Sequence, residues 1–237
     1  LPMWITIPGA AIFTAAISFI IAFPILRTRG VYMVLATFAF AEVVAGVIIN
    51  MDVVGGASGY EVPDFAELGM LSIFAFAITV FVFYLLATRF GLSMRAVHDD
   101  ENVAALFGVN VRMTQVMTFT IGGALAGIAG ALYAHQYNYI EIQYFNILIS
   151  IFVLLYVLIG GTQTAWGPLF GAIIFTFLPE FLRLPEMAGV ANGGVLAEWR
   201  FVIFGVFLVA VMVFRPEGLI TRALVDRLRH GRAPDDA

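Results

Sequence analysis

Residues that could carry out chemistry are few in this 237-residue sequence, and they lie far apart. Ser58 and His135 could form a nucleophile and base pair, which requires hydrogen-bond contact between the two side chains. Glu42 is a lone carboxylate inside a long apolar stretch. The sequence has no cysteine, no lysine and no G-x-x-x-x-G-K-[ST] loop, which excludes a thiolate metal site and an ATP site of that type in this chain.

The composition places these residues in a membrane protein. Hydrophobic residues make up 62% of the chain and charged residues only 12%, about half the share in an average soluble domain. The charges cluster in short segments between long uncharged ones, as an alternation of spans and loops requires. The net charge of -4 argues against nucleic acid as a partner. No basic segment precedes the first apolar stretch, so we expect an N-terminally truncated membrane protein and not a signal peptide.

Seven apolar stretches are candidates to cross the bilayer, whose ~30 Å hydrocarbon core needs about 20 helical residues. The run from Ile142 to Pro179 is too long for one crossing, so we split it at Gly160-Gly161 and Gly167-Pro168. We therefore expect an all-α, polytopic membrane helix bundle that forms a single domain over residues 1–237. The expected spans are Met3–Leu26, Val31–Ile49, Leu68–Thr88, Met113–Ala134, the two halves of Ile142–Pro179, and Phe201–Phe214.

The arginines orient these spans. All twelve basic residues are arginine, and basic residues favour cytoplasmic loops. One orientation places ten arginines inside and leaves only Arg183 and Arg200 outside. It predicts a cytoplasmic C-terminal tail and an outward-facing acidic loop at residues 50–67. The segments placed inside are 27–30, 89–112, 160–168 and the tail 215–237.

Within the polar segment 89–112, residues 93–110 have the marks of a short helix that lies outside the membrane. Asp100 is suited to cap it, Glu101 lies in its first turn, and Gly108 suits the position after its end. The helix is either an amphipathic connector on the lipid headgroups or a projection on which another protein docks. Because this chain has no nucleotide site, a partner that hydrolyses ATP would need such a projection to act on it.

Small residues repeat at helical spacing in residues 121–132, IGGALAGIAGAL. Spacing of this kind lets two helices approach closely in lipid. We predict a role in helix packing, without chemistry, for Gly122, Gly123, Ala126, Gly127 and Gly130.

Glu42 lies inside its expected span, where a charge costs at least ~2.5 to 3.5 kcal/mol. It should therefore face the bundle interior, a partner or water. It is either a hydrogen-bonded structural glutamate or a residue near a substrate path, and the sequence leaves both open. Our candidates for a translocation path are Glu42 together with Gly55, Gly56 and Ser58 of the glycine-rich run 54–60.

The stretch RAVHDDENVAALFGVNVRMTQVMTFTIGGALAGIAGALYAH (95–135) resembles the branched-chain amino-acid permeases of the ATP-binding-cassette importers, the Liv type. The resemblance implies a permease subunit, not an enzyme, that moves leucine, isoleucine or valine across the inner membrane. Three more stretches agree with that family in the same order along the chain: LRTRGVYMVLATFAFAEVV (26–44), LIGGTQTAWGPLFGA (158–172) and FRPEGL (214–219).

The same resemblance implies partners in the lipid bilayer and on both sides of it. These are a second homologous permease subunit, two cytoplasmic ATPase subunits that bind the ATP, and a periplasmic or extracellular amino-acid-binding protein. No cofactor is expected on this chain itself. By this resemblance residues 95–108 form the coupling segment to the ATPases. Its polar contacts would come from Arg95, His98, Asp99, Asp100 and Glu101, and its close-docking surface from Ala104, Ala105 and Gly108.

Two alternatives stay open. A related permease for urea or a small amide would share the coupling segment, although LIGGTQTAWGP is more similar to the branched-chain type. The run Gly56-Ala57-Ser58-Gly59 also looks like the GASG of rhomboid-type intramembrane serine proteases, with His135 as the base. Against this, Ser58 lies in an acidic loop and not at the start of a buried span. We interpret His98 as a solvated docking residue and predict no metal site.

Overall fold

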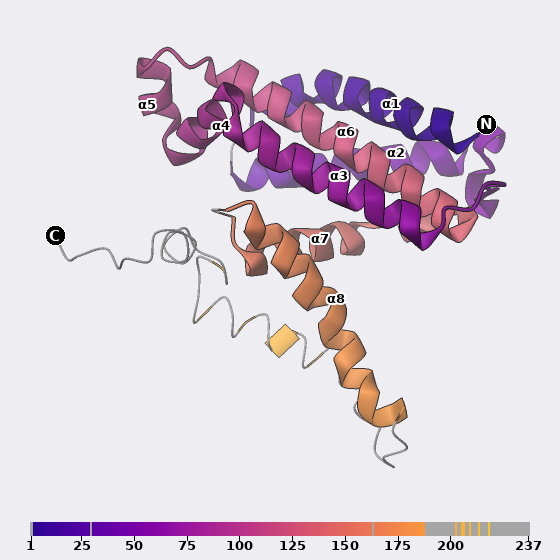
Figure 1. The fold of residues 1–237 in the computed structure, drawn as a ribbon. Coiled ribbons are helices and arrows are strands. Elements are labelled where there is room, and N and C mark those ends of the chain that lie inside the picture. The colour runs from indigo at the N-terminus through magenta and orange to yellow at the C-terminus, as the bar shows by residue number, and fades with distance from the viewer. Residues whose placement is uncertain are drawn as a thin grey trace. The chain divides into compact units, whose positions relative to one another are not determined.

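The computed structural model describes residues 2–28, 30–162 and 164–187, with side chains up to residue 177, and a few isolated positions beyond. The chain divides into two compact units, residues 1–147 and 148–237. Each unit is described by itself, with the elements labelled as in Figure 1.

The first unit is built from four long apolar helices and two short ones. The long helices match the first four expected spans, which are thereby confirmed with ends that differ by a few residues. An apolar helix is stable in lipid because all its backbone hydrogen bonds are made internally. The long helices are α1 (Met3–Ile25), α2 (Val31–Ile49), α3 (Leu68–Ala87) and α6 (Val111–Tyr137), and the short ones are α4 (Arg89–Asp99) and α5 (Glu101–Leu106).

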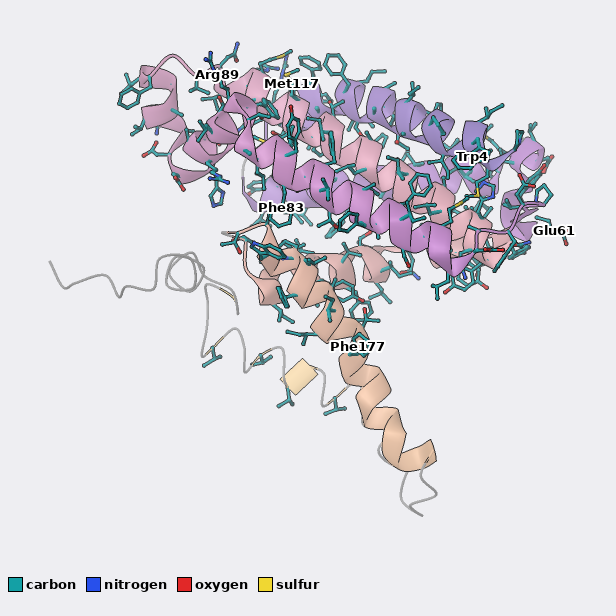
Figure 2. All side chains as sticks on the ribbon, viewed as in Figure 1. Trp4, Glu61, Phe83, Arg89, Met117 and Phe177 are labelled. Carbon is teal, nitrogen blue, oxygen red and sulfur yellow. The ribbon has the colours of Figure 1, made fainter. Side chains whose placement is uncertain are left out.

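The two ends of this unit differ in structure. Helices α4 and α5 lie at the end opposite the N-terminus (Figure 1), which we call the α5 end. The connections 50–66 and 138–146 lie at the other end, which we call the loop end. Figure 2 shows the separation, with Arg89 at the α5 end and Glu61 at the loop end. The loop end holds the antiparallel strands β1 (Tyr60–Glu61) and β2 (Tyr139–Ile140) and the short 3-10 helices η1 (Asp52–Val54), η2 (Gly56–Ser58) and η3 (Ile142–Tyr144).

Helices α1 and α6 lie side by side along most of their length (Figure 1). Their contact is close because α6 presents glycine there. A Cβ atom placed on Gly127 would overlap the Thr14 hydroxyl and lie 2.7 Å from the Ala10 carbonyl oxygen. A Cβ atom on Gly123 would overlap Ser18 in the same way. Small residues one helical turn apart on both helices therefore set the distance between the two backbones.

The other predicted small residues of α6 do not face α1. A Cβ atom on Gly122 or Gly130 would meet no described atom within 4 Å. Ala126 is exposed on the same side of the helix. Among the described residues, Gly123 and Gly127 of this repeat therefore lie in the contact with α1, and the other three small residues lie outside it.

The second unit contains a helical hairpin of α7 (Ile147–Gly160) and α8 (Trp166–Met187). The expected break at Gly160-Gly161 is confirmed as the turn between them, whereas Gly167 and Pro168 lie in the first turn of α8, where proline is tolerated. The two backbones touch at Gly160 and Gly167, which have no side chains to separate them. Gly218, at a φ of 86°, packs against Gly161.

Five helical segments within the described residues are long and apolar enough to cross a membrane. They are the first five of the seven expected spans. In the sixth, α8, the described side chains form a shorter apolar stretch, Trp166–Phe177. The seventh, Phe201–Phe214, and the tail 215–237 lie outside the described residues apart from isolated positions. The expected all-α, polytopic membrane protein is confirmed.

The glycine contact between α1 and α6 predicts different effects for two alanine substitutions in α6, one inside the contact and one outside it. Both Gly127→Ala and Gly130→Ala gain about 1 kcal/mol of helix propensity, so their difference isolates packing. Gly127→Ala should lower the free energy of unfolding by about 1 to 3 kcal/mol through overpacking against Thr14 and Ala10. Gly130→Ala should leave it unchanged or raised. Thermal unfolding of both variants in detergent checks this, and equal unfolding temperatures would contradict the contact.

Candidate functional site

The short helix α5 is held at its start by Asp100. The Asp100 carboxylate accepts hydrogen bonds from the backbone N–H groups of Asn102 (2.8 Å) and Val103 (3.1 Å). A helix begins with N–H groups that have no partner within the helix, and an aspartate at this position satisfies them. The negative charge of Glu101 also lies in the first turn, where the helix dipole favours it. The predicted roles of Asp100 and Glu101 in the helix are confirmed.

A second short helix, α4, precedes α5 in the polar segment, and the sequence did not predict it. Helix α4 already begins at Arg89, directly after α3, because the Thr88 hydroxyl oxygen accepts from the Gly91 N–H. The helix then breaks at Asp100, whose backbone is extended at φ −159° and ψ 115°. Since a capping residue must leave the helical conformation, the same aspartate that starts α5 ends α4.

Gly108 ends α5 in the way its residue type predicts. Its φ is +82°, a conformation that costs little only for glycine. The Gly108 N–H donates to the Ala105 carbonyl and the Val109 N–H donates to the Ala104 carbonyl, at 3.0 and 3.1 Å. This pair of bonds is the Schellman arrangement, which satisfies the last carbonyl groups of a helix. The predicted position of Gly108 after the helix end is confirmed.

Helix α5 is fastened directly to the long helix α6. The Gln115 side-chain amide donates a 2.8 Å hydrogen bond to the Glu101 carboxylate. Asn110 caps α6 by accepting from the Met113 N–H at 3.0 Å. Only residues 107–110 separate the two helices, so α5 is a compact projection attached to the start of α6 and not a mobile loop.

Most residues predicted for the coupling segment lie on the surface of this projection. Ala104 is an exception, since only 3% of it is exposed. The prediction that Ala104 forms part of a docking surface is therefore wrong, because its side chain faces inward on α5. Glu101 is half-buried by its bond to Gln115. The exposed members are Arg95, His98, Asp99, Asp100, Ala105 and Gly108.

Sequence reasoning missed the two most exposed apolar residues of this region. Leu106 is 86% exposed and Phe107 is 84% exposed, at the end of α5. The two side chains are adjacent and form an exposed apolar patch, which is suited to contact with a protein or a membrane. The signal was present in the sequence, because Leu106 and Phe107 directly precede the helix-ending Gly108.

At the loop end, the predicted path residues Gly55, Gly56 and Ser58 form a tight turn. Gly55 and Gly56 have positive φ, and a Cβ atom on Gly55 would overlap the backbone of Gly59. The Tyr139 hydroxyl donates a 2.5 Å hydrogen bond to the Ser58 carbonyl oxygen. The glycines therefore allow this loop to close on itself and to pack against the segment that follows α6.

His135 and Ser58 do not form a nucleophile and base pair in this structure. His135 is 2% exposed, and both ring nitrogens have other neighbours. Nδ1 lies 2.9 Å from the Asp64 carbonyl oxygen, and Nε2 lies 2.7 Å from the Thr6 hydroxyl. The imidazole is thus occupied by structural contacts, and the geometry of the protease alternative is not formed.

Glu42 lies in the middle of α2 and is exposed. No residue of α2 is buried in the described part of the chain. Because a carboxylate in the hydrocarbon region needs a polar neighbour or water, this face of α2 is not one that lipid alone would cover. Both interpretations of Glu42 remain compatible with its position.

An open groove of about 520 Å³ runs between α3 and α6, near the loop end. Its walls are mainly apolar, with four polar side chains among them. One of these is Gln136, whose side-chain oxygen is buried without a hydrogen-bond partner among the described residues. A groove of this kind suits an apolar group with a polar end. The lining residues are Leu71, Ser72, Ala75, Ile78, Ala129, Leu132, Tyr133, Gln136 and Tyr137.

Comparisons with known proteins agree on one family. A profile of the family described as "Branched-chain amino acid transport system / permease component" matches residues 1–212. The high-affinity branched-chain amino acid transport system permease protein LivM of Escherichia coli K12 is 26% identical over 98% of this chain and 61% of its own length. A probable LivM permease protein of Methanocaldococcus jannaschii is 26% identical over 89% and 66%. The LivH permease protein of Escherichia coli K12 is 26% identical over 64% and 45%.

The chain spans about three fifths of the length of the LivM proteins of Escherichia coli and Salmonella typhimurium that it matches. No solved structure gives a significant match.

Removing the cap of α5 tests the geometry of the projection. Asp100→Ala should destabilise α5 by about 1 kcal/mol, because two N–H groups lose their acceptor. Asp100→Asn should retain most of the stability, since an asparagine oxygen also caps. Hydrogen exchange of the amides in residues 101–108 measures the difference. Equal exchange rates in the two variants would contradict the capping role.

Proposed function

This chain belongs to the branched-chain amino acid transport permease family, and we propose on that basis that it is the membrane-spanning permease subunit of an ATP-driven importer for leucine, isoleucine and valine. The main support is the family match over residues 1–212, together with relatives whose names specify branched-chain amino acid transport. The chain is a multi-pass membrane protein, and its span-length helices suit a pore-forming subunit. We place it in the inner membrane with the C-terminus in the cytoplasm.

The energy for transport would come from other subunits. The sequence has no G-x-x-x-x-G-K-[ST] loop and no lysine to hold nucleotide phosphates. We therefore assign ATP to two cytoplasmic ATPase subunits that dock on the projection of α4 and α5. Relatives named LivM and LivH both align with this chain, which supports a second, homologous permease subunit as its membrane partner. A periplasmic or extracellular binding protein would deliver the amino acid.

The projection has the features of a docking element. Capping at Asp100 and the Schellman turn at Gly108 make α5 a defined helix, and the bond from Gln115 to Glu101 joins it to α6. Leu106 and Phe107 at its tip offer an apolar anchor, and exposed polar residues surround it. Buried aromatic and aliphatic anchors contribute most of the energy of protein interfaces. We assign Phe107 as the main contact of this chain with an ATPase subunit.

The path for the amino acid is proposed from chemistry. Side chains of leucine, isoleucine and valine need an apolar surface, and the groove between α3 and α6 offers one. Four polar side chains also line this groove and could bind the polar end of the amino acid. Glu42 remains a candidate at the path because its exposed position within α2 requires a polar environment.

Uptake by the assembled complex tests the proposed function. Vesicles that contain the full-length protein, the second permease and the ATPase subunits, with the binding protein outside and ATP inside, should accumulate radiolabelled leucine. Uptake without ATP, and uptake of urea in place of leucine, are the controls. ATP-dependent uptake of urea but not leucine would retain the importer and replace its substrate.

A charge at the tip of α5 should uncouple the ATPase subunits. Phe107→Asp removes the apolar anchor and should reduce co-purification of the ATPases by about tenfold or more, the effect expected for losing one hot-spot residue. Val53→Asp is the matched control, because Val53 is 87% exposed and lies at the loop end. Val53→Asp should bind the ATPases normally. Equal binding by both variants would contradict the docking role of Phe107.

A further inference from the structure

His135, in the last turn of α6, connects that helix to two other segments at the loop end. Its ring lies between the first turn of α1, through Thr6, and the segment 62–66, through the Asp64 carbonyl oxygen. A carbonyl oxygen can only accept, so Nδ1 donates the hydrogen bond to Asp64. The His135 carbonyl oxygen also accepts from the Ala66 N–H at 3.0 Å.

The other described hydrogen bonds of segment 62–66 also go to the start of α1 and the end of α6. The Val62 N–H donates to the Asn138 carbonyl oxygen, just after α6, at 2.9 Å. The Met3 N–H donates to the Asp64 carboxylate at 3.1 Å. Ala66 is fully buried in a small apolar cluster with Met3, Ile7 and Leu132. Residues 62–66 are therefore fixed to the ends of α1 and α6 before the chain enters α3.

These contacts connect α3 to α6 at the loop end, and a second connection exists at the α5 end. At the α5 end, α3 continues directly into α4, and α5 is bonded to α6 through Glu101 and Gln115. At the loop end, the segment leading into α3 is bonded to the last turn of α6 at His135. The groove lined by both helices lies beside this connection at the loop end. Helix α6, about 40 Å long for its 27 residues, thus connects the docking projection to the loop end.

We propose that His135 is a positioning residue for transport, which fastens residues 62–66 to α6 so that movement at the docking projection shifts α3 and α6 together. This inference rests on the proposed function. Without the bond from Nδ1 to Asp64, residues 62–66 keep their backbone bonds to Asn138 and His135 but lose their side-chain bond to α6, so movement of the projection is passed less completely to α3 and the groove. The ATPase subunits then hydrolyse ATP without moving the amino acid.

Three substitutions distinguish this role from one in which the side chain at position 135 is needed only for packing. Asparagine places an N–H donor near the position of Nδ1, so His135→Asn retains the bond to Asp64. Glutamine places its donor near Nε2, so His135→Gln retains only the contact to Thr6. Thr6→Val removes that contact and leaves the Asp64 bond intact, which makes it the matched control.

The experiment measures leucine uptake and ATP hydrolysis on the same vesicles of the full complex. His135→Gln should lose about tenfold or more in uptake per ATP hydrolysed, a typical coupling effect, while hydrolysis and the amount of protein in the membrane stay close to wild type. His135→Asn and Thr6→Val should keep the wild-type ratio. His135→Ala should behave as His135→Gln. If His135→Ala does not reach the membrane, the comparison of uptake per ATP between His135→Asn and His135→Gln tests the inference.

Equal ratios of uptake to hydrolysis in His135→Asn and His135→Gln would overturn the inference, because the Asp64 bond would then have no part in coupling. A parallel loss of uptake and hydrolysis in His135→Gln would overturn it as well, since the residue would then serve only assembly. A wild-type complex that hydrolyses ATP but imports no leucine would overturn the proposed function, and the inference with it.

Discussion

The contact between α1 and α6 is the interaction on which the arrangement of the first unit depends. Lipid is as apolar as the side chains of these helices, so no hydrophobic force drives the helices together in the membrane. Their association must come from close packing, and Gly123 and Gly127 allow it against Ala10, Thr14 and Ser18. Once α6 is held in this way, the positions of both its ends are defined.

The two ends of α6 are stabilised by polar contacts of different kinds. At the α5 end, Asp100 and Gly108 satisfy free backbone groups of the short helix α5, and Asn110 does the same at the start of α6. At the loop end, His135 and Asp64 bond to backbone and hydroxyl groups from segments distant in sequence. Local capping makes the projection rigid by itself, whereas the loop end is rigid only while α1, α6 and residues 62–66 stay together.

The apolar surface of the first unit follows from its solvent. Helices α2 and α3 have no buried residue within the described part of the chain, and their side chains are suited to lipid or to neighbouring helices. Two features do not fit lipid alone, the exposed Glu42 and the groove between α3 and α6. Both agree with the proposed permease subunit, in which protein neighbours and the amino acid would cover these surfaces.

The sequence by itself determined the membrane class, the first five spans, and the cap and end of α5, because hydrophobicity, charge and glycine act over a few neighbouring residues. It also pointed to the family, through four stretches in order. Only the tertiary structure decided which glycines of α6 meet α1, that Ala104 faces inward while Phe107 stands free, and that His135 contacts Thr6 and Asp64 and not Ser58. Those facts depend on the rotation of each helix about its axis and on pairs of residues far apart in the chain. A uniformly apolar helix contains no pattern that specifies which of its faces will be covered.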